Sequence, residues 1–299
     1  ESRPAMTEPS PKAPSAGRPD AAATPSLADA VAALASHVEM LIEEGVRETE
    51  LDRETLRELS RPPRRPTVSA PPASRPIAST PAGTPAPKPT EADLEAARRR
   101  LQEIAAEIAE CRKCPLHRTR TQTVPGQGFP RPEILFVGEG PGQDEDRQGL
   151  AFVGRAGALL TRMITAMGLS REEVFIANVV KCRATENYAM VKDRAPTLDE
   201  MQACLPYLRA QIAVLRPQVI VTLGNAALEG LTGLKGITRL RGQWREYDGV
   251  PLLPTYHPAF LLRGGGDDTA RYWDVWDDLC AVLRRIGREP PPRKRPAAG

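Results

Sequence analysis

The residues of this chain best suited to chemistry are its cysteines, which number five in 299 residues. Cys111 and Cys114 form a Cys-x-x-Cys pair, and in an intracellular chain this spacing is more typical of a metal site than of a disulfide. Cys182 and Cys204 flank a loop and could supply two more thiolates, although each could also be a buried free thiol. By spacing alone, four such ligands fit zinc or a [4Fe–4S] cluster equally well. Cys280, in a terminal helical pattern, is expected in the core.

A second group of useful residues lies where short apolar runs end. Glu139 follows the first run, Asn178 lies at the end of the second, and His257 follows the fourth. The runs cover residues 133–138, 174–180, 218–224 and 251–256. Helical patterns lie between and after them, near residues 155–168, 197–214, 225–232 and 269–286. This alternation predicts an α/β fold in which helices cover both faces of a parallel sheet. Ligands of such folds bind at the carboxyl ends of the strands, so we expect these side chains to share one crevice.

The loop after the first run, VGEGPGQDE, exposes main-chain N–H groups and lets a ligand approach the backbone closely. It lacks the lysine of a P-loop and the helix-opening third glycine of a dinucleotide fingerprint. Glu139 lies between two glycines at the strand tip, where a carboxylate can orient a water or stabilise positive charge on a sugar. The alternative is a generic turn in which Glu139, Asp144, Glu145 and Asp146 are solvated acids.

The chain divides by composition into an extension, a folded domain and a tail. Sixteen of its 31 prolines precede residue 90, and a segment so rich in Pro, Ala and Ser is expected to be disordered. Within this extension, residues 26–60 form one amphipathic helical pattern that could dock on a partner protein or self-associate. The folded domain is expected over residues 91–288, beginning with a helix after Thr90, and residues 289–299 form a basic disordered tail.

Hydropathy and charge indicate where in the cell the protein is expected and whether it binds a membrane. No apolar run is long enough to span a membrane, and the first residues lack a secretory pattern. The formal net charge of +3 is a weak argument for any partner. We therefore expect a soluble, intracellular protein with no membrane partner.

Several ordered motifs resemble one known family. The chain contains CRKCPL, GEGPG, GLAFVGRAGALL, NVVKCR and HPAFLLR in this order, and over about residues 95–286 it closely resembles the family 4 uracil-DNA glycosylases. The resemblance implies an α/β/α sandwich with a central four-stranded parallel sheet and a cytoplasmic, bacterial setting. It also implies a monofunctional enzyme that hydrolyses the N-glycosidic bond of uracil in DNA and leaves an abasic site.

The resemblance also implies roles for individual residues. Phe152 would stack on the everted uracil, and Asn178 would read its edge with one amide. His257 would donate a hydrogen bond to uracil O2, where negative charge collects, and main-chain N–H groups around Gly140 and Gly142 would assist. Glu139 would place the attacking water or balance the charge on the sugar. Without the resemblance, Phe152 and His257 could be core residues and Asn178 a strand-end amide.

Further roles concern DNA and the metal. The resemblance implies that Cys111, Cys114, Cys182 and Cys204 hold a [4Fe–4S] cluster, with zinc as the alternative. Arg239 and Arg241 would face DNA, and Leu261 would push an apolar wedge into the duplex, unless it belongs to a helix core.

The chain departs from the family in one region and leaves two other functions open. The segment between Cys182 and Cys204 is several residues longer than usual, lacks the Pro-Pro after the third cysteine, and contains Tyr188 and Met190, whose contacts the sequence does not indicate. One alternative function is a catalytically inactive, metal-stapled DNA-binding or polymerase-associated module. Another is a zinc enzyme that acts on a different base.

Overall fold

The structure is a computed structural model that describes residues 89–186, 192–263 and 269–292. The expected helix over residues 26–60, Tyr188, Met190 and the end of the basic tail lie outside the described residues. Within the described part, no helix has both the length and the apolar character that crossing a bilayer requires.

One mixed sheet forms the centre of the domain. Its strands are β1 (Gln127–Gly128), β2 (Ile134–Gly138), β3 (Phe175–Asn178), β4 (Val219–Leu223), β5 (Arg245–Tyr247) and β6 (Val250–Thr255). The spatial order is β1-β3-β2-β4-β6-β5. The four inner strands are mutually parallel, and the short outer strands β1 and β5 pair antiparallel. The expected four-stranded parallel sheet is thus confirmed, extended at both edges.

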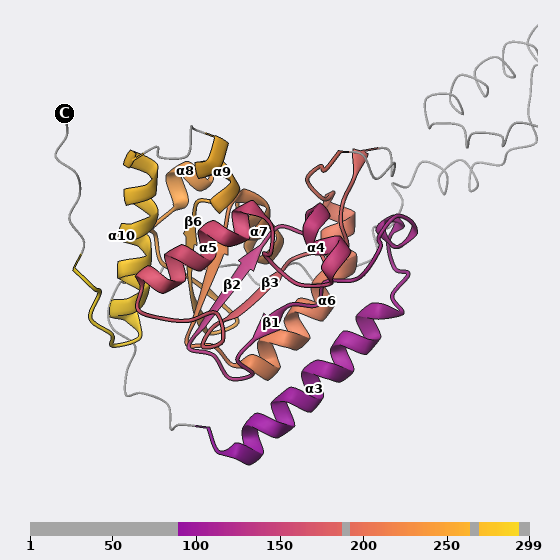
Figure 1. The fold of residues 1–299 in the computed structure, drawn as a ribbon, viewed down its shortest axis with the longest axis horizontal. Helices are drawn as coiled ribbons and strands as arrows, with labels where there is room; N and C mark the ends of the chain where they lie inside the picture. Colours follow the sequence, from indigo (N-terminus) through magenta and orange to yellow (C-terminus); the bar gives the residue numbers. More distant parts are fainter. Residues whose placement is uncertain (1–88, 187–191, 264–268, 293–299) are drawn as a thin grey trace, which may run out of the picture. The chain divides into compact units, whose positions relative to one another are not determined.

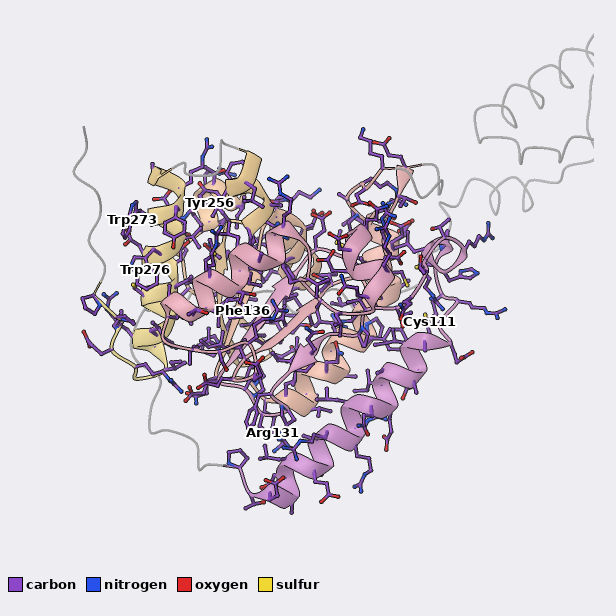
Figure 2. All side chains as sticks on the ribbon, in the orientation of Figure 1. Cys111, Arg131, Phe136, Tyr256, Trp273 and Trp276 are labelled. Carbon is purple, nitrogen blue, oxygen red and sulfur yellow. The ribbon has the colours of Figure 1, made fainter. Side chains whose placement is uncertain are left out.

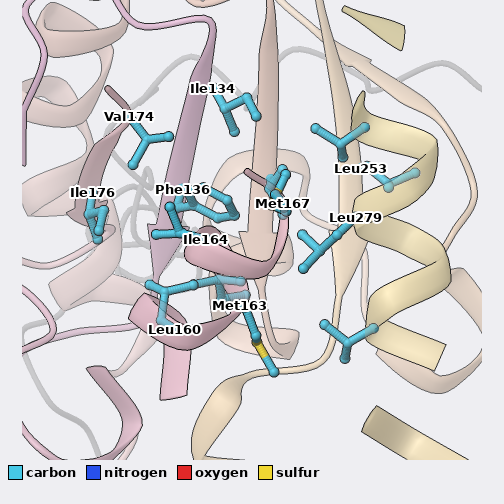
Figure 3. Packing of buried hydrophobic residues seen from close by; sticks show 14 of the residues in the cluster. Ile134, Phe136, Leu160, Met163, Ile164, Met167, Val174, Ile176, Leu253 and Leu279 are labelled. Atoms are coloured by element: carbon cyan, nitrogen blue, oxygen red, sulfur yellow. The ribbon is translucent and has the colours of Figure 1, made fainter. Parts of the chain in front are cut away.

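Two helical layers cover the sheet, because alternate residues of each buried strand point to opposite faces. Helices α5 (Arg155–Ala166), α9 (Pro258–Arg263) and α10 (Thr269–Arg285) lie on one face (Figure 1). On this face Phe136 of β2 packs with Ile164 of α5, while Leu253 of β6 lies beside Leu279 of α10 (Figure 3). Helices α3 (Glu91–Ala109), α6 (Leu198–Leu215) and α7 (Asn225–Thr232) cover the other face, against Leu135 and its neighbours. The α/β/α sandwich is therefore confirmed.

Local sequence explains where the helices begin. Thr90 caps α3 as expected, since its hydroxyl accepts the Asp93 N–H while the Asp93 carboxylate accepts the Thr90 N–H. Thr197 and Glu200 form the same box at the start of α6. Three short elements lie in the connections, namely η1 (Pro115–Arg118), α4 (Gln143–Gln148) and α8 (Ile237–Leu240).

The two edge strands were not predicted from the sequence. β1 has two residues and β5 has three, which is too short for a visible alternation. The turn between β5 and β6 did carry a signal, because Asp248-Gly249 has positive φ at both residues and joins two antiparallel strands. An Asp-Gly pair of this kind is the preferred two-residue hairpin connection.

A buried carboxylate joins α10 to the end of β6. Asp278 accepts hydrogen bonds from the Thr255 hydroxyl at 2.6 Å and from the Arg241 guanidinium at 2.9 and 3.1 Å. Burial raises the pKa of Asp278 to about 6, although the Thr255 and Arg241 donors act in the opposite direction. The domain therefore contains an acid that takes up a proton in the folded state at mildly acidic pH.

We predict that Asp278→Asn will flatten the pH dependence of stability between about pH 4 and pH 6. The folded pKa lies above the unfolded value of about 3.9, so the folded state binds more protons in this window and stability falls as pH rises. For a shift of this size the contribution is at most about 3 kcal/mol. Thermal unfolding at several pH values, with the exposed Asp199→Asn as control, measures it. Parallel curves for parent and Asp278→Asn would contradict the prediction.

Candidate active site and cysteine site

The carboxyl ends of the parallel strands open into one cavity of about 720 Å³. Glu139 and Gly140 follow β2, Asn178 ends β3, and His257 follows β6, and all four line this cavity together with Phe152 from the loop after α4. The structure therefore brings together every residue expected at the base site. Segments far apart in the sequence meet here because the strands are parallel and their carboxyl ends share an edge.

Phe152 and Asn178 meet over a glycine at the end of β2. A Cβ atom at Gly138 would lie 2.4 Å from Asn178 Oδ1 and 2.5 Å from Phe152 Cζ. A side chain at this position would therefore displace both groups. Asn178 is 1% exposed, and among the described residues its Oδ1 has no hydrogen-bond partner. Because a buried acceptor without a partner is costly, this oxygen marks a position for a ligand donor beside an aromatic ring.

Phe152 is held in a backbone conformation that residues with a side chain rarely adopt. Its φ is +54°. The Arg171 guanidinium donates to the Ala151 carbonyl at 2.7 Å and to the Phe152 carbonyl at 3.0 Å. Gly157 in α5 permits this arrangement, since a Cβ there would lie 1.9 Å from the Phe152 carbonyl oxygen. Backbone strain maintained by its surroundings is typical of a functional site.

His257 has a defined tautomer in its neutral form. Its Nδ1 lies 3.1 Å from the main-chain nitrogen of Ala259, which can only donate, so Nδ1 is the acceptor and the ring proton belongs to Nε2. The ring centroid of His257 lies 5.6 Å from that of Phe152. The imidazole therefore carries its donor N–H beside the aromatic face that lines the cavity.

Two acids of the glycine loop are structural, contrary to the generic-turn alternative of solvated acids. The carboxylate of Glu145 accepts the N–H groups of Val153 and Gly154 at 2.9 and 2.8 Å and that of Gly142 at 3.1 Å. It thereby joins the glycine loop to the Phe152 loop. The Gly142 N–H is consequently engaged, which corrects the expectation that it assists a leaving group. Asp146 is buried and accepts the Thr121 N–H.

The four expected metal ligands surround a second, small pocket. Cys111, Cys114, Cys182 and Cys204 all line it, and Cys111 lies just beyond the end of α3, far from Trp273 and Trp276 of α10 (Figure 2). Cys280 belongs to the core on the α10 side, as expected. Within the described residues, no three His, Cys, Asp or Glu side chains are placed to hold a single metal ion. The thiols thus face a common space without converging on one point.

Hydrogen-bond donors accompany the sulfur atoms. The Arg120 guanidinium donates to Cys182 Sγ at 3.4 Å, and the Lys181 N–H donates to Cys204 Sγ at 3.3 Å. Burial raises the pKa of the Cys114 and Cys182 thiols, and raises that of Cys204 to about 12. These thiols remain protonated at neutral pH unless a metal replaces the proton, because the charged form is poorly solvated.

Two of the residues expected to touch DNA are structural. Arg241 pairs with the buried Asp278, and its side chain is 20% exposed. Leu261 is 3% exposed in the core that includes α10, because it lies on the inner side of α9. The pairing of Arg241 corrects its expected contact with DNA, and Leu261 follows the stated alternative of a helix-core residue rather than a wedge. Phe260 lines the cavity instead of Leu261, and Arg239 on α8 is exposed, so its DNA role stays a prediction.

The long segment between Cys182 and Cys204 adds a wall to the cavity. Main-chain bonds join Arg194 to Ala184 and Glu186 to Lys192 across an isolated bridge. Arg194 also forms a two-bonded ion pair with the buried Glu200, at 2.7 Å for each bond. Cavity-lining residues from this segment are Ala184, Asp193, Arg194, Ala195 and Pro196. The extra length of this segment was visible in the sequence, but its position at the wall of the cavity was not.

A doubly covered parallel sheet with this cavity and a four-cysteine pocket defines the class of protein. The family model described as the uracil DNA glycosylase superfamily matches residues 125–280, and the chain belongs to this superfamily. Within it, the chain is similar to type-4 uracil-DNA glycosylases. It is 45% identical over 172 residues to that of Sulfurisphaera tokodaii, covering 54% of this chain and 76% of the relative.

Two other relatives carry the same description. The chain is 44% identical over 196 residues to the type-4 uracil-DNA glycosylase of Thermotoga maritima, covering 64% of this chain and 98% of the relative. It is also 44% identical over 171 residues to that of Archaeoglobus fulgidus, covering 54% and 83%. The family resemblance drawn from the motifs is thereby confirmed.

We predict that Gly157→Ala will destabilise the domain by about 1–3 kcal/mol, because the new methyl group meets the fixed main chain at Phe152. Urea unfolding should show a lower midpoint with an unchanged slope. Ala158→Ser, at the next and exposed position of α5, is the control and should stay within about 0.5 kcal/mol of the parent. A Gly157→Ala midpoint equal to that of the control would refute the close approach.

Proposed function

We propose that this protein is a monofunctional uracil-DNA glycosylase, which hydrolyses the N-glycosidic bond of uracil in DNA and leaves an abasic site. The observation that carries the proposal is the buried, unpaired Oδ1 of Asn178 beside the ring of Phe152 in an open cavity. A base everted from DNA needs such a pocket, with an aromatic face for stacking and polar groups for its edge. The named relatives support the same activity.

Asn178 supplies the base selectivity. Its amide oxygen accepts the N3–H of uracil, while its amide nitrogen donates to O4. Cytosine presents an acceptor where uracil has a donor, and a donor where uracil has an acceptor. A fixed amide would therefore place acceptor against acceptor and donor against donor, and these groups would stay unpaired. A site built this way rejects the wrong base strongly, because unpaired buried polar groups are costly.

His257 and Glu139 act on opposite charges that develop as the bond breaks. The electron pair of the C1′–N1 bond moves to the base, and the Nε2–H of His257 stabilises the negative charge at uracil O2. The sugar becomes positively charged, and the Glu139 carboxylate balances that charge and orients the water that adds to C1′. Gly140 gives the base close access to the main chain at the same loop.

DNA approaches at the cavity mouth. The exposed Arg239 on α8 would contact phosphates, and Asn225 holds this segment by accepting the Gly236 N–H at 2.8 Å. Phe260 offers an apolar side chain at the mouth.

We further propose that the four cysteines bind a [4Fe–4S] cluster. The four thiols line one pocket, and four cysteine ligands are the usual set for such a cluster, with zinc as the alternative. The bound cluster would supply a rigid cross-link between the end of α3, the segment after β3 and helix α6. Arg120 and Lys181 would supply hydrogen bonds to its thiolate ligands.

The enzyme proposal predicts cleavage of an oligonucleotide that contains uracil, measured after alkaline treatment of abasic sites. His257→Ala should lower kcat by about 10²–10³-fold, since it removes a donor to the leaving group. Asn178→Ala should lower kcat/KM by about tenfold or more. Leu198→Ala, at an exposed position of α6, is the control and should match the parent. A folded parent that yields no more strand scission than a buffer blank would favour the inactive, metal-stapled module instead.

The cluster proposal predicts about four iron and four labile sulfide per chain, with visible absorption in the purified protein. Cys182→Ala should lose most of both, because it removes one ligand. Cys280→Ala, a buried cysteine outside the pocket, should keep them. Zinc at about one equivalent in place of iron would contradict the cluster and restore the zinc alternative.

A further inference from the structure

Lys181 is a fully buried lysine that contacts both sites. It is 1% exposed and lines the cysteine pocket. Its main-chain N–H donates to Cys204 Sγ at 3.3 Å. Its ammonium donates to the main-chain carbonyl of Asn178 at 2.8 Å and to Gln211 Oε1 at 2.7 Å. One residue therefore connects a cysteine ligand to the residue that would read the base.

The bond to Asn178 fixes the peptide group that follows the base-reading residue. This peptide consists of the Asn178 carbonyl and the Val179 N–H. The N–H donates to the Gly138 carbonyl at 2.9 Å, while the carbonyl accepts from Lys181. Both ends of the peptide are thus held, one by β2 and the other by the buried ammonium. This peptide is bonded to the Asn178 Cα, so Lys181 restrains the main chain from which the amide extends.

The cysteine site would supply the negative charge that balances the Lys181 ammonium. Among the described residues, no ion pair joins Lys181 to a carboxylate. An isolated buried ammonium is costly, and an apolar side chain of similar size would avoid that cost. The main chain of Lys181 contacts Cys204, so metal-bound thiolates in this pocket would place negative charge near the ammonium.

We propose that Lys181 is a positioning residue that ties the Asn178 amide to the metal-bound cysteine site, an inference that rests on the functions proposed above. Gln211 completes the connection. Its Oε1 accepts from the ammonium, and its Nε2 donates to the Pro125 carbonyl at 2.7 Å, which anchors the pair to the segment before β1. Metal binding at the cysteines would in this way support base recognition without contact with the base.

Lys181→Met tests the proposal in the full chain, since it keeps the length of the side chain and removes its charge and donors. We expect kcat/KM on the uracil oligonucleotide to fall about tenfold or more, the loss of a hydrogen bond from a charged group. Hydrogen exchange at the Val179 amide should accelerate by a similar factor. Iron content should stay at the parent level, while the reduction potential of the cluster should fall, because a nearby positive charge is removed.

Two other variants sharpen the test. Lys235→Met removes an exposed lysine paired with Glu229 and should leave all readouts unchanged. Gln211→Met removes an acceptor of the Lys181 ammonium, so hydrogen exchange at Val179 should accelerate. It keeps the buried charge, so the reduction potential should stay near the parent value. It also decides the question if Lys181→Met does not fold.

The outcomes distinguish the positioning role of Lys181 from the proposed glycosylase activity. Parent values of kcat/KM and Val179 exchange in Lys181→Met would overturn the positioning role while the glycosylase stands. A parent that binds iron but releases no uracil would overturn the proposed activity, and the exchange and potential measurements would still decide whether Lys181 links the two sites.

Discussion

The pairing of β2 with β3 is the constraint on which the base site depends. In this register Gly138 lies opposite Asn178 at the last position of both strands. The hydrogen bonds of the sheet therefore place a residue without a side chain beside the amide, and the ring of Phe152 fills the space that a Cβ would occupy. A shift of one residue would turn Asn178 to the other face of the sheet. The position of the Asn178 amide is thus set by the hydrogen-bond ladder of the sheet.

Charged side chains, partly or fully buried, then fix the loops that leave the strand ends. The Glu145 carboxylate joins the glycine loop to the Phe152 loop, and the Arg171 guanidinium holds the strained Phe152 main chain. Asp278 links α10 to Thr255 at the end of β6, two residues before His257. Each group bonds main-chain or side-chain partners directly, which compensates its removal from water. Such loops can keep catalytic side chains in place before a substrate arrives.

The sequence predicted elements better than it predicted the environment of charged side chains. The four inner strands and the helices α5, α6, α7 and α10 were foreseen because continuous apolar runs and helical periodicity are local signals. Solvation of Glu145 was the alternative considered and Arg241 was expected to face DNA, because the partners of a charged side chain come from distant segments that the sequence does not reveal. For Leu261 the alternative of a helix core holds, since the start of α9 at Pro258 sets which of its residues turn inward. Glu139, Asn178 and His257 were expected to share one crevice because they lie at strand ends, whereas Phe152, in the loop after α4, was expected there only from the family resemblance.

The proposed reaction transfers no electrons, which bears on why a chain of this class would carry a metal cluster. Breaking the glycosidic bond and adding water changes no oxidation state. A cluster would therefore not be needed to transfer electrons in this reaction. Two of the expected ligands, Cys111 and Cys114, lie in the turn between α3 and η1, so a metal bound there would fix a segment outside regular secondary structure. Cys182 follows Asn178 by four residues, so a cross-link there also fixes the chain leaving β3. With the cluster proposed above, the cysteine site would act on catalysis through the position of the main chain, by the same route through which Lys181 reaches the amide proposed to read the base.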